Sequence, residues 1–182
     1  LWEPYPGTTG APRTQLAGHG GPIRAMAFAP DGITMATAGT DLTLRVWSLS
    51  RIRSTERAAV PLIAEINAMT YFVDGKTVAS AGADGVIRLW DMTAMTPRVR
   101  AELKGHDGAV RELVMTPDGK ALASVGDDLR VINWDPQSGK PMQQWQLAVE
   151  GASAFALTLD GRYLACGTAT GKLDLYRVAE KR

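Results

Sequence analysis

Two histidines and one cysteine are the side chains of this 182-residue chain best suited to nucleophilic or metal chemistry. A histidine beside a serine or cysteine can act as a general base, and histidine also binds zinc. His19 and His106 each follow a glycine, and each precedes a tryptophan by 28 residues, at Trp47 and Trp134. Because the two histidines share one position and one spacing, we interpret both as structural. No histidine is then left for a catalytic triad.

The tryptophans belong to an internal repeat. Trp47, Trp90, Trp134 and Tyr176 lie 43, 44 and 42 residues apart, and an Asp-Gly pair begins 16 residues before each of them. Asp-Gly between apolar runs is typical of a tight hairpin turn, because glycine adopts positive φ at no steric cost. The flanking runs predict strands, and no helical period competes with them. The expected strands are residues 23–28, 34–38, 43–47, 66–72, 77–81, 86–90, 98–104, 110–115, 121–125, 129–134, 142–147, 154–159, 163–166 and 172–176.

A four-stranded unit repeated every ~40–45 residues is typical of a β-propeller blade. Three segments resemble WD repeats: LAGHGGPIRAMAFAPDG, YFVDGKTVASAGADGVIRLWD and LKGHDGAVRELVMTPDGKALASVGDDLRVINWD. The resemblance covers nearly the whole chain. It implies an all-β fold, a β-propeller of four-stranded antiparallel WD-type blades with four repeats present. We expect one propeller segment over residues 1–182, with repeats at about 13–56, 57–97, 98–140 and 141–182.

In WD repeats a histidine, a strand hydroxyl, a turn aspartate and the terminal tryptophan form a buried hydrogen-bonded chain. Imidazole can donate at one nitrogen and accept at the other, so it can join a carboxylate to a hydroxyl. The second repeat has Leu62 at the histidine position, and the fourth repeat has lost all four residues. The resemblance therefore implies a structural network of His19, Thr37, Asp41 and Trp47, of Ser80, Asp84 and Trp90, and of His106, Ser124, Asp128 and Trp134.

Other catalytic or metal-binding patterns are absent from the sequence. It contains no nucleophile elbow, P-loop or zinc-protease motif, and its aspartates lack the spacing of a calcium loop. Cys166 replaces a strand Ser or Thr of the other repeats, so we expect an inert core residue rather than a nucleophile. We therefore predict no catalytic residue, no cofactor and no metal site, and a protein that is not an enzyme.

The two ends leave the size of the propeller open. Residues 1–12 resemble the passage after the third repeat, so we interpret them as the end of a preceding repeat. Three arrangements fit: a fragment of a larger propeller, which we favour, two copies that complete one ring, or a closed four-bladed unit. In the last arrangement residues 13–17 serve as the outer strand of the fourth blade. Propellers of four to eight blades exist, and an unclosed set leaves strand edges prone to association.

The resemblance also implies a partner-binding face, because WD repeats bind through positions near the histidine and the turn aspartate. Function is expected on the loops and the rim around the central channel. We expect a non-catalytic protein–protein interaction scaffold. The alternative is an accessory or regulatory module of a larger enzyme or signalling protein whose catalytic domain lies outside this chain. The candidate partner-binding residues are Arg24, Thr40, Glu65, Asn67, Arg111, Asp127 and Ser153.

The balance of basic and acidic residues indicates which kinds of partner to expect. The chain has 20 basic and 19 acidic residues, so electrostatics favours neither nucleic acid nor an anionic membrane. The expected partners are other proteins or peptides, with self-association as a further option. The 14 arginines against 6 lysines are typical of a GC-rich bacterial genome. A single cysteine forms no internal disulfide, and we expect a cytoplasmic location by default.

Overall fold

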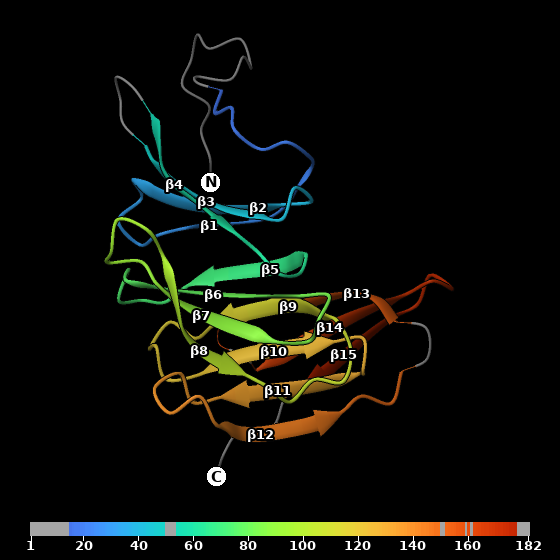
Figure 1. Cartoon of the computed structure of the whole chain (residues 1–182). Coiled ribbons are helices and arrows are strands. Elements are labelled where there is room, and N and C mark those ends of the chain that lie inside the picture. Colours follow the sequence, from blue (N-terminus) through green and yellow to red (C-terminus); the bar gives the residue numbers. More distant parts are fainter. Residues whose placement is uncertain (1–14, 50–53, 150–151, 159, 161, 178–182) are drawn as a thin grey trace, which may run out of the picture.

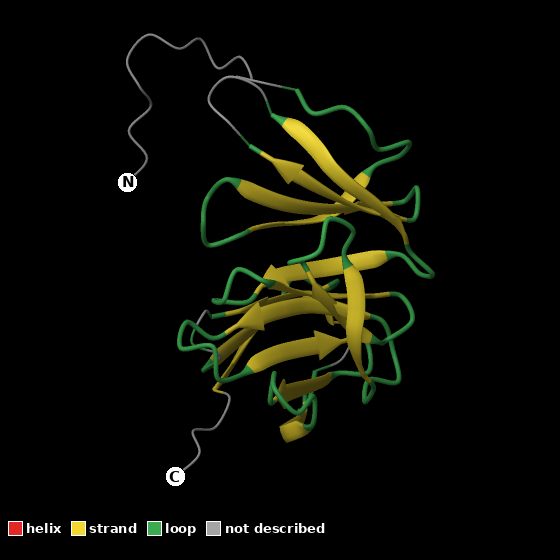
Figure 2. Ribbon diagram, turned by 60° about the vertical axis from the view of Figure 1, so that its left-hand side comes forward, coloured by secondary structure: helices red, strands yellow, loops and turns green. Residues whose placement is uncertain are grey.

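The computed structural model describes residues 15–49, 54–149, 152–158, 160 and 162–177. Every regular element in this part of the chain is a β-strand, as Figure 1 and Figure 2 show. The strands form three four-stranded sheets and one three-stranded sheet, and all pairings within them are antiparallel. The predicted fold of WD-type blades is confirmed.

Each sheet is built from strands that follow one another along the chain, and we call it a blade. Blade 1 contains β1 (Ile23–Phe28), β2 (Thr34–Gly39), β3 (Thr43–Ser48) and β4 (Thr55–Pro61). Blade 2 contains β5 (Ile66–Tyr71), β6 (Thr77–Gly82), β7 (Ile87–Asp91) and β8 (Arg98–Leu103). Blade 3 contains β9 (Val110–Met115), β10 (Leu122–Gly126), β11 (Arg130–Trp134) and β12 (Pro141–Gln146). Blade 4 contains β13 (Ala152–Leu157), β14 (Tyr163–Thr168) and β15 (Leu173–Arg177).

The Asp-Gly pairs form the hairpin turns between the first two strands of the blades. Gly32, Gly75 and Gly119 have φ of 67°, 65° and 70°, a backbone conformation that glycine adopts without strain. Asp31 supports its turn by accepting the backbone N–H groups of Ile33 and Thr34 at 2.8 and 2.9 Å. The fourth glycine, at position 161, lies outside the described residues.

The second strand of the first three blades runs to a glycine that the sequence analysis left outside the expected strand. Gly39, Gly82 and Gly126 pair with the first residues of β1, β5 and β9, where the register shifts. A Cβ at Gly82 would lie 1.8 Å from the carbonyl oxygen of Glu65, so only glycine permits this approach. The strands also include β4, the fourth strand of the first repeat, for which the sequence analysis gave no range. Leu159, in the range expected for β13, lies outside the described residues.

The core lies between blades. The inner strands contact one another in the order β1, β5, β9 and β13, and blades 2 and 3 turn their tryptophan faces toward the preceding blade. Trp90 shares an apolar cluster with Leu44 and Val46 of blade 1, and Trp134 shares one with Ile87 and Leu89 of blade 2. The stability of each blade therefore depends on its neighbours.

The ring is not closed, and both end blades expose apolar side chains. Leu173 and Leu175 of β15 are 75% and 71% exposed, whereas Ile87 and Leu89 at the matching positions of β7 are 0% and 1% exposed. At the other end, Met26 is 59% exposed and its counterpart Met69 only 9%. At the matching positions of blade 2, the neighbouring blades bury these apolar side chains.

The closed four-bladed arrangement differs from the structure. Residues 15–17 form no strand, and β15 is the edge of its sheet in the part of the chain that the structure describes. Residues 1–12, expected to end a preceding repeat, and residues 13 and 14 lie outside the described residues. The fragment and the two-copy arrangements stay predictions.

A matched pair of leucines tests the packing between blades. We expect Leu89→Ala to lower the free energy of unfolding by about 2–5 kcal/mol, because it opens a cavity between blades 2 and 3. Leu175→Ala, at the same strand position in blade 4, removes an exposed side chain and is expected to change stability by about 0.5 kcal/mol or less. Urea denaturation measures both values. An equal loss of unfolding free energy in both variants would contradict the exposure of the apolar face of blade 4.

Candidate functional site

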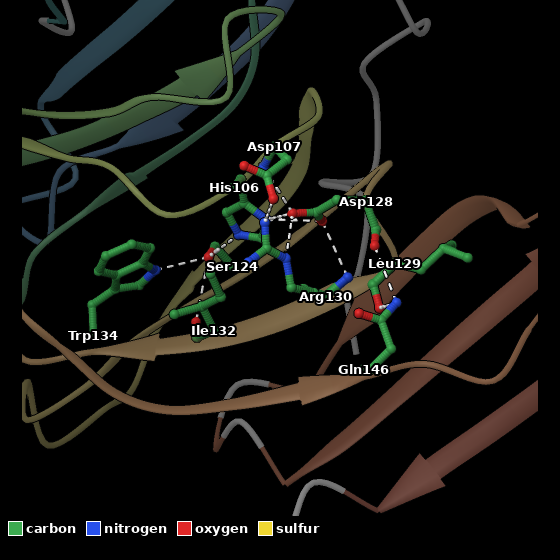
Figure 3. Close-up of polar contacts among 9 residues, drawn as sticks. All are labelled: His106, Asp107, Ser124, Asp128, Leu129, Arg130, Ile132, Trp134 and Gln146. Carbon is green, nitrogen blue, oxygen red and sulfur yellow. Dashed lines mark hydrogen bonds and ion pairs between the residues drawn. The ribbon is translucent and has the colours of Figure 1, made fainter.

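In blade 3 the structure joins the four predicted network residues into one chain of hydrogen bonds (Figure 3). The ring N–H of Trp134 donates to Ser124 Oγ at 2.8 Å, and Ser124 Oγ lies 2.7 Å from His106 Nε2. His106 Nδ1 lies 3.0 Å from both oxygens of Asp128. Since indole only donates and carboxylate only accepts, a neutral imidazole accepts from the serine and donates to the aspartate. Both ring nitrogens of His106 are therefore engaged.

Blade 1 repeats this arrangement. Trp47 Nε1 donates to Thr37 Oγ1 at 2.8 Å, Thr37 Oγ1 lies 2.7 Å from His19 Nε2, and His19 Nδ1 lies 3.0 Å from Asp41 Oδ2. The glycine before each histidine has a steric reason. A Cβ at Gly105 would lie 2.8 Å from Cη2 of Trp134, so a side chain there would displace the ring.

The two network aspartates are held in the charged form. Burial alone would raise the pKa of Asp41, but hydrogen bonds from the Gly20 backbone, the His19 ring and Thr43 outweigh it and keep this pKa well below its usual range. Burial also opposes the ionised form of Asp128. Hydrogen bonds from His106 and from backbone N–H groups nevertheless lower its pKa. Both carboxylates are therefore fully used as acceptors inside the fold.

Blade 2 keeps half of the network and replaces the rest. Trp90 Nε1 donates to Ser80 Oγ at 2.8 Å, as in the other blades. Asp84, which has no histidine to accept from, instead lies 2.7 Å from the guanidinium of Arg88. Arg88 is buried and also pairs with Glu102 of β8 at 3.3 Å. In blade 2 an arginine therefore holds the carboxylate without a histidine, whereas Asp128 of blade 3 is bound by both His106 and Arg130.

Blade 4 has no polar network at these positions. Cys166 stands at the place of Thr37 and Ser124, and it is buried among Val125, Val131 and other apolar side chains. Burial raises the pKa of its thiol, and the carboxylate of Asp174 adds to this effect. A thiol that resists ionisation is poorly suited to act as a nucleophile.

The candidate partner-binding residues fall into two groups and three separate positions. Arg24 of β1 and Asn67 of β5 line one cavity of about 220 Å³ between the inner strands. Asn67 also donates to the carbonyl oxygen of Val110 at 3.0 Å, which links blade 2 to blade 3. Arg24 is exposed, so its guanidinium is available to a partner.

Arg111 and Asp127 form the second group, because they pair with each other. Arg111 Nε lies 2.7 Å from Asp127 Oδ1, and its Nη2 lies 2.6 Å from Oδ2. The hydrogen bonds of this bidentate pair raise the pKa of Arg111, and its guanidinium binds a carboxylate of its own blade. Thr40, Glu65 and Ser153 lie apart from both groups. Thr40 and Glu65 make backbone bonds to Pro22 and Ala83, and the Ser153 hydroxyl donates to Gly167 at 3.4 Å.

Glu112 was missed by the sequence analysis. Its side chain lines the same cavity as Arg24 and Asn67, burial raises the pKa of its carboxyl, and no hydrogen bond or ion pair joins it to another described residue. Strand register places Glu112 opposite Val125, where the other inner strands have Ala25, Ala68 and Ala154. An acidic residue at a position that is alanine in three repeats was a signal in the sequence.

The profile of the family described as "WD domain, G-beta repeat" matches residues 10–48, 63–91 and 97–135, more than half of the chain. The chain belongs to the WD-repeat family. The three matches lie over blades 1 to 3. Blade 4, which lacks the polar network, lies beyond them.

Two mammalian WD-repeat proteins are similar in sequence to this chain. The chain is similar to U3 small nucleolar RNA-interacting protein 2 of Homo sapiens, with 33% identity over 76 residues, 36% of this chain and 16% of that protein. It is also similar to transducin-like enhancer protein 2 of Mus musculus, with 25% identity over 160 residues, 88% of this chain and 15% of that protein. The chain therefore spans only a small part of the length of both, and they do not support the expected bacterial source.

Within the described ranges, no group of three or more His, Cys, Asp or Glu side chains is placed to hold a metal ion. The same part of the chain contains no helix of the length and apolar character that crossing a bilayer requires.

The network aspartates predict how stability depends on pH. A depressed pKa in the folded state means that the unfolded chain binds more protons, so stability is full above the ordinary aspartate pKa and falls as the pH drops below about 4. We expect Asp128→Asn to be less stable than the parent at about pH 7 and to lose less stability on acidification. Urea denaturation across this range measures the difference. Glu65→Gln, which removes one negative charge from a side chain outside the network, controls for net charge. A variant at Asp128 whose stability runs parallel to that of the parent at every pH would contradict this role.

Proposed function

We propose that this WD-repeat chain is a non-catalytic scaffold that binds other proteins through the inner rim of its blades. The observation that carries the proposal is the cavity where Arg24 of blade 1, Asn67 of blade 2 and Glu112 of blade 3 meet. It brings together an exposed cation and a carboxylate with no partner of its own, drawn from three different blades.

The chemistry of this rim favours recognition of a side chain. Its volume of about 220 Å³ is below the ~300–1,000 Å³ typical of small-molecule sites, so it suits one inserted group of a larger partner. A desolvated carboxylate gains most from a cationic partner group, and Arg24 favours an anionic group beside it. The preferred partner surface therefore carries a lysine or arginine next to an acidic residue.

Two further observations favour binding over catalysis. Both histidines have both ring nitrogens engaged within their own blades, so neither is free to move a proton to or from a substrate. The thiol of Cys166 is buried.

A second candidate function is an accessory or regulatory module of a longer protein. It is favoured by the small share, 16% and 15%, that the chain covers of the two relatives. Under this proposal the rim docks a domain of the same polypeptide. Expression of the chain with and without its neighbouring coding sequence separates the two, because an attached domain would occupy the rim and compete with external partners.

Self-association is the third partner proposal. It is supported by the uncovered faces of blade 1 and blade 4, which carry complementary sides of a blade-to-blade contact. A head-to-tail arrangement of two copies would cover both faces in each copy.

Charge reversal at the rim tests the scaffold function. We expect the variant with Arg24→Glu and Glu112→Lys to capture at least tenfold less of the partner proteins than the parent chain does. Quantitative mass spectrometry of the affinity eluates measures the captured amounts. The reason is that both polar anchors of the cavity change sign while the network residues stay intact.

The control is Lys120→Glu, which changes the charge of a highly exposed side chain in a turn of blade 3. It should capture the same proteins as the parent. Unchanged capture by the rim variant would exclude this face, and turnover of a substrate by the isolated chain would refute the non-catalytic assignment.

A further inference from the structure

The connection between blades 1 and 2 differs from the connection between blades 2 and 3. Val60 of β4 pairs with Leu44 and precedes Ile66 by six positions, whereas Leu103 of β8 pairs with Ile87 and precedes Val110 by seven. The connection into blade 2 is thus one residue shorter, and it contains no Gly-His. Counted along the outer strand, Leu62 corresponds to Gly105.

A leucine cannot take the place of that glycine over the tryptophan. At Gly105 even a Cβ would come within 2.8 Å of Cη2 of Trp134, so the shorter connection must follow another path past Trp90. Leu62 turns into the core between blades 1 and 2, and no imidazole covers the indole. In blade 2, Leu62, Arg88 and Trp90 instead line one pocket.

The result is a pocket of about 390 Å³ between blades 1 and 2. Its walls are mostly apolar, and the buried residues Trp90 and Arg88 also line it. Arg57 of β4 fixes the two blades on either side by donating to the carbonyl oxygens of Met92 and Ala94 at 3.0 and 2.8 Å. The apolar walls comprise Val60, Pro61, Leu62, Ile63, Ala64, Ile66, Pro97 and Val99.

The charges of this pocket leave one cation available. Arg88 is paired with Asp84 and Glu102, and Glu102 is paired in addition with Lys104. The guanidinium of Arg98, which lines the pocket from β8, forms no hydrogen bond or ion pair with another described side chain. Arg98 lies opposite Asp91 in the strand pairing and influences the carboxylate of Asp91 electrostatically. An occupant with a carboxylate next to its apolar group therefore complements this site.

The surroundings of the pocket favour a peptide as the occupant. Its mouth carries apolar side chains that reach into solvent, with Ile63 80% exposed and Val99 43% exposed. It also lies between β4 and β8, the outer edge strands of their sheets in the described part of the chain. An edge strand offers backbone N–H and C=O groups to an extended chain, and a pocket beside it selects one side chain of that chain.

We propose that this pocket binds an extended peptide segment of a partner protein, which inserts one large apolar side chain over Trp90 and places an acidic residue against Arg98. The site is separate from the inner rim, and it exists because the second repeat lacks the Gly-His pair. A propeller blade that has lost part of its hydrogen-bonded network has thereby gained a docking site.

Fluorescence anisotropy with a defined peptide tests this site. The probe is a fluorescein-labelled peptide with the central sequence Glu-Phe-Glu between serine residues, titrated with the 182-residue chain. We expect saturable binding that weakens at least tenfold when Phe in the peptide is replaced by Ala. Replacing both Glu by Gln should weaken binding to the parent but make no difference to binding by Arg98→Ala.

Variants of the chain complete the test. Ile63→Asp places a carboxylate at the mouth and should weaken binding at least tenfold, while Ile33→Asp, at another exposed isoleucine outside the pocket, should leave it unchanged. Thermal unfolding verifies that both variants fold. The rim variant with Arg24→Glu and Glu112→Lys should bind the peptide like the parent, which separates this site from the proposed scaffold face.

Three results would overturn the proposal: no saturable binding of the peptide, equal affinity of the parent and Ile63→Asp, or equal affinity of the peptides with Phe and Ala. Binding of decanoate, a small apolar acid, without binding of the peptide would likewise overturn it and indicate a small-molecule site.

Discussion

The hydrogen bond from a tryptophan ring to a hydroxyl on the neighbouring strand is the interaction on which these blades depend. It measures 2.8 Å in blades 1, 2 and 3 and joins the third strand of each blade to the second. The bond satisfies the polar atom of a large buried ring and so permits the rest of the indole to face apolar neighbours. The bond thus fixes the ring that packs blades 2 and 3 against the blade before each of them.

The groups around this bond vary, and the variation decides what each blade can do. In blades 1 and 3 a histidine and an aspartate complete the hydrogen-bonded chain. Both ring nitrogens of the histidine are therefore engaged within the blade. In blade 2 an arginine pairs with the aspartate, the covering loop is shorter, and a pocket remains beside the ring. The inner rim, by contrast, is assembled from single polar residues contributed by three blades. Binding capacity therefore arises where the repeat departs from its own pattern.

Much of this arrangement was predictable from the sequence, because strand positions and network residues depend on local spacing. The Asp-Gly turns and the repeat spacing were enough to place most strands, and the resemblance to WD repeats implied the partners of His19 and His106. Contacts between side chains of different strands were not predictable in the same way. The pairing of Arg111 with Asp127 and the place of Glu112 beside Arg24 and Asn67 are contacts of this kind. The shortened connection before blade 2 becomes visible only when the outer strands are aligned by their register.

Hydrogen exchange of the indole N–H groups, followed by NMR and assigned by Trp→Phe substitution, tests the central claim most directly. The account predicts strong protection for Trp47, Trp90 and Trp134. Trp145, whose ring N–H has no acceptor among the described residues, serves as the internal reference and is expected to exchange fast. Ser80→Ala should then abolish the protection of Trp90 alone. Exchange of Trp90 or Trp134 as fast as that of Trp145 would contradict the view that the indole–hydroxyl bond organises the blades.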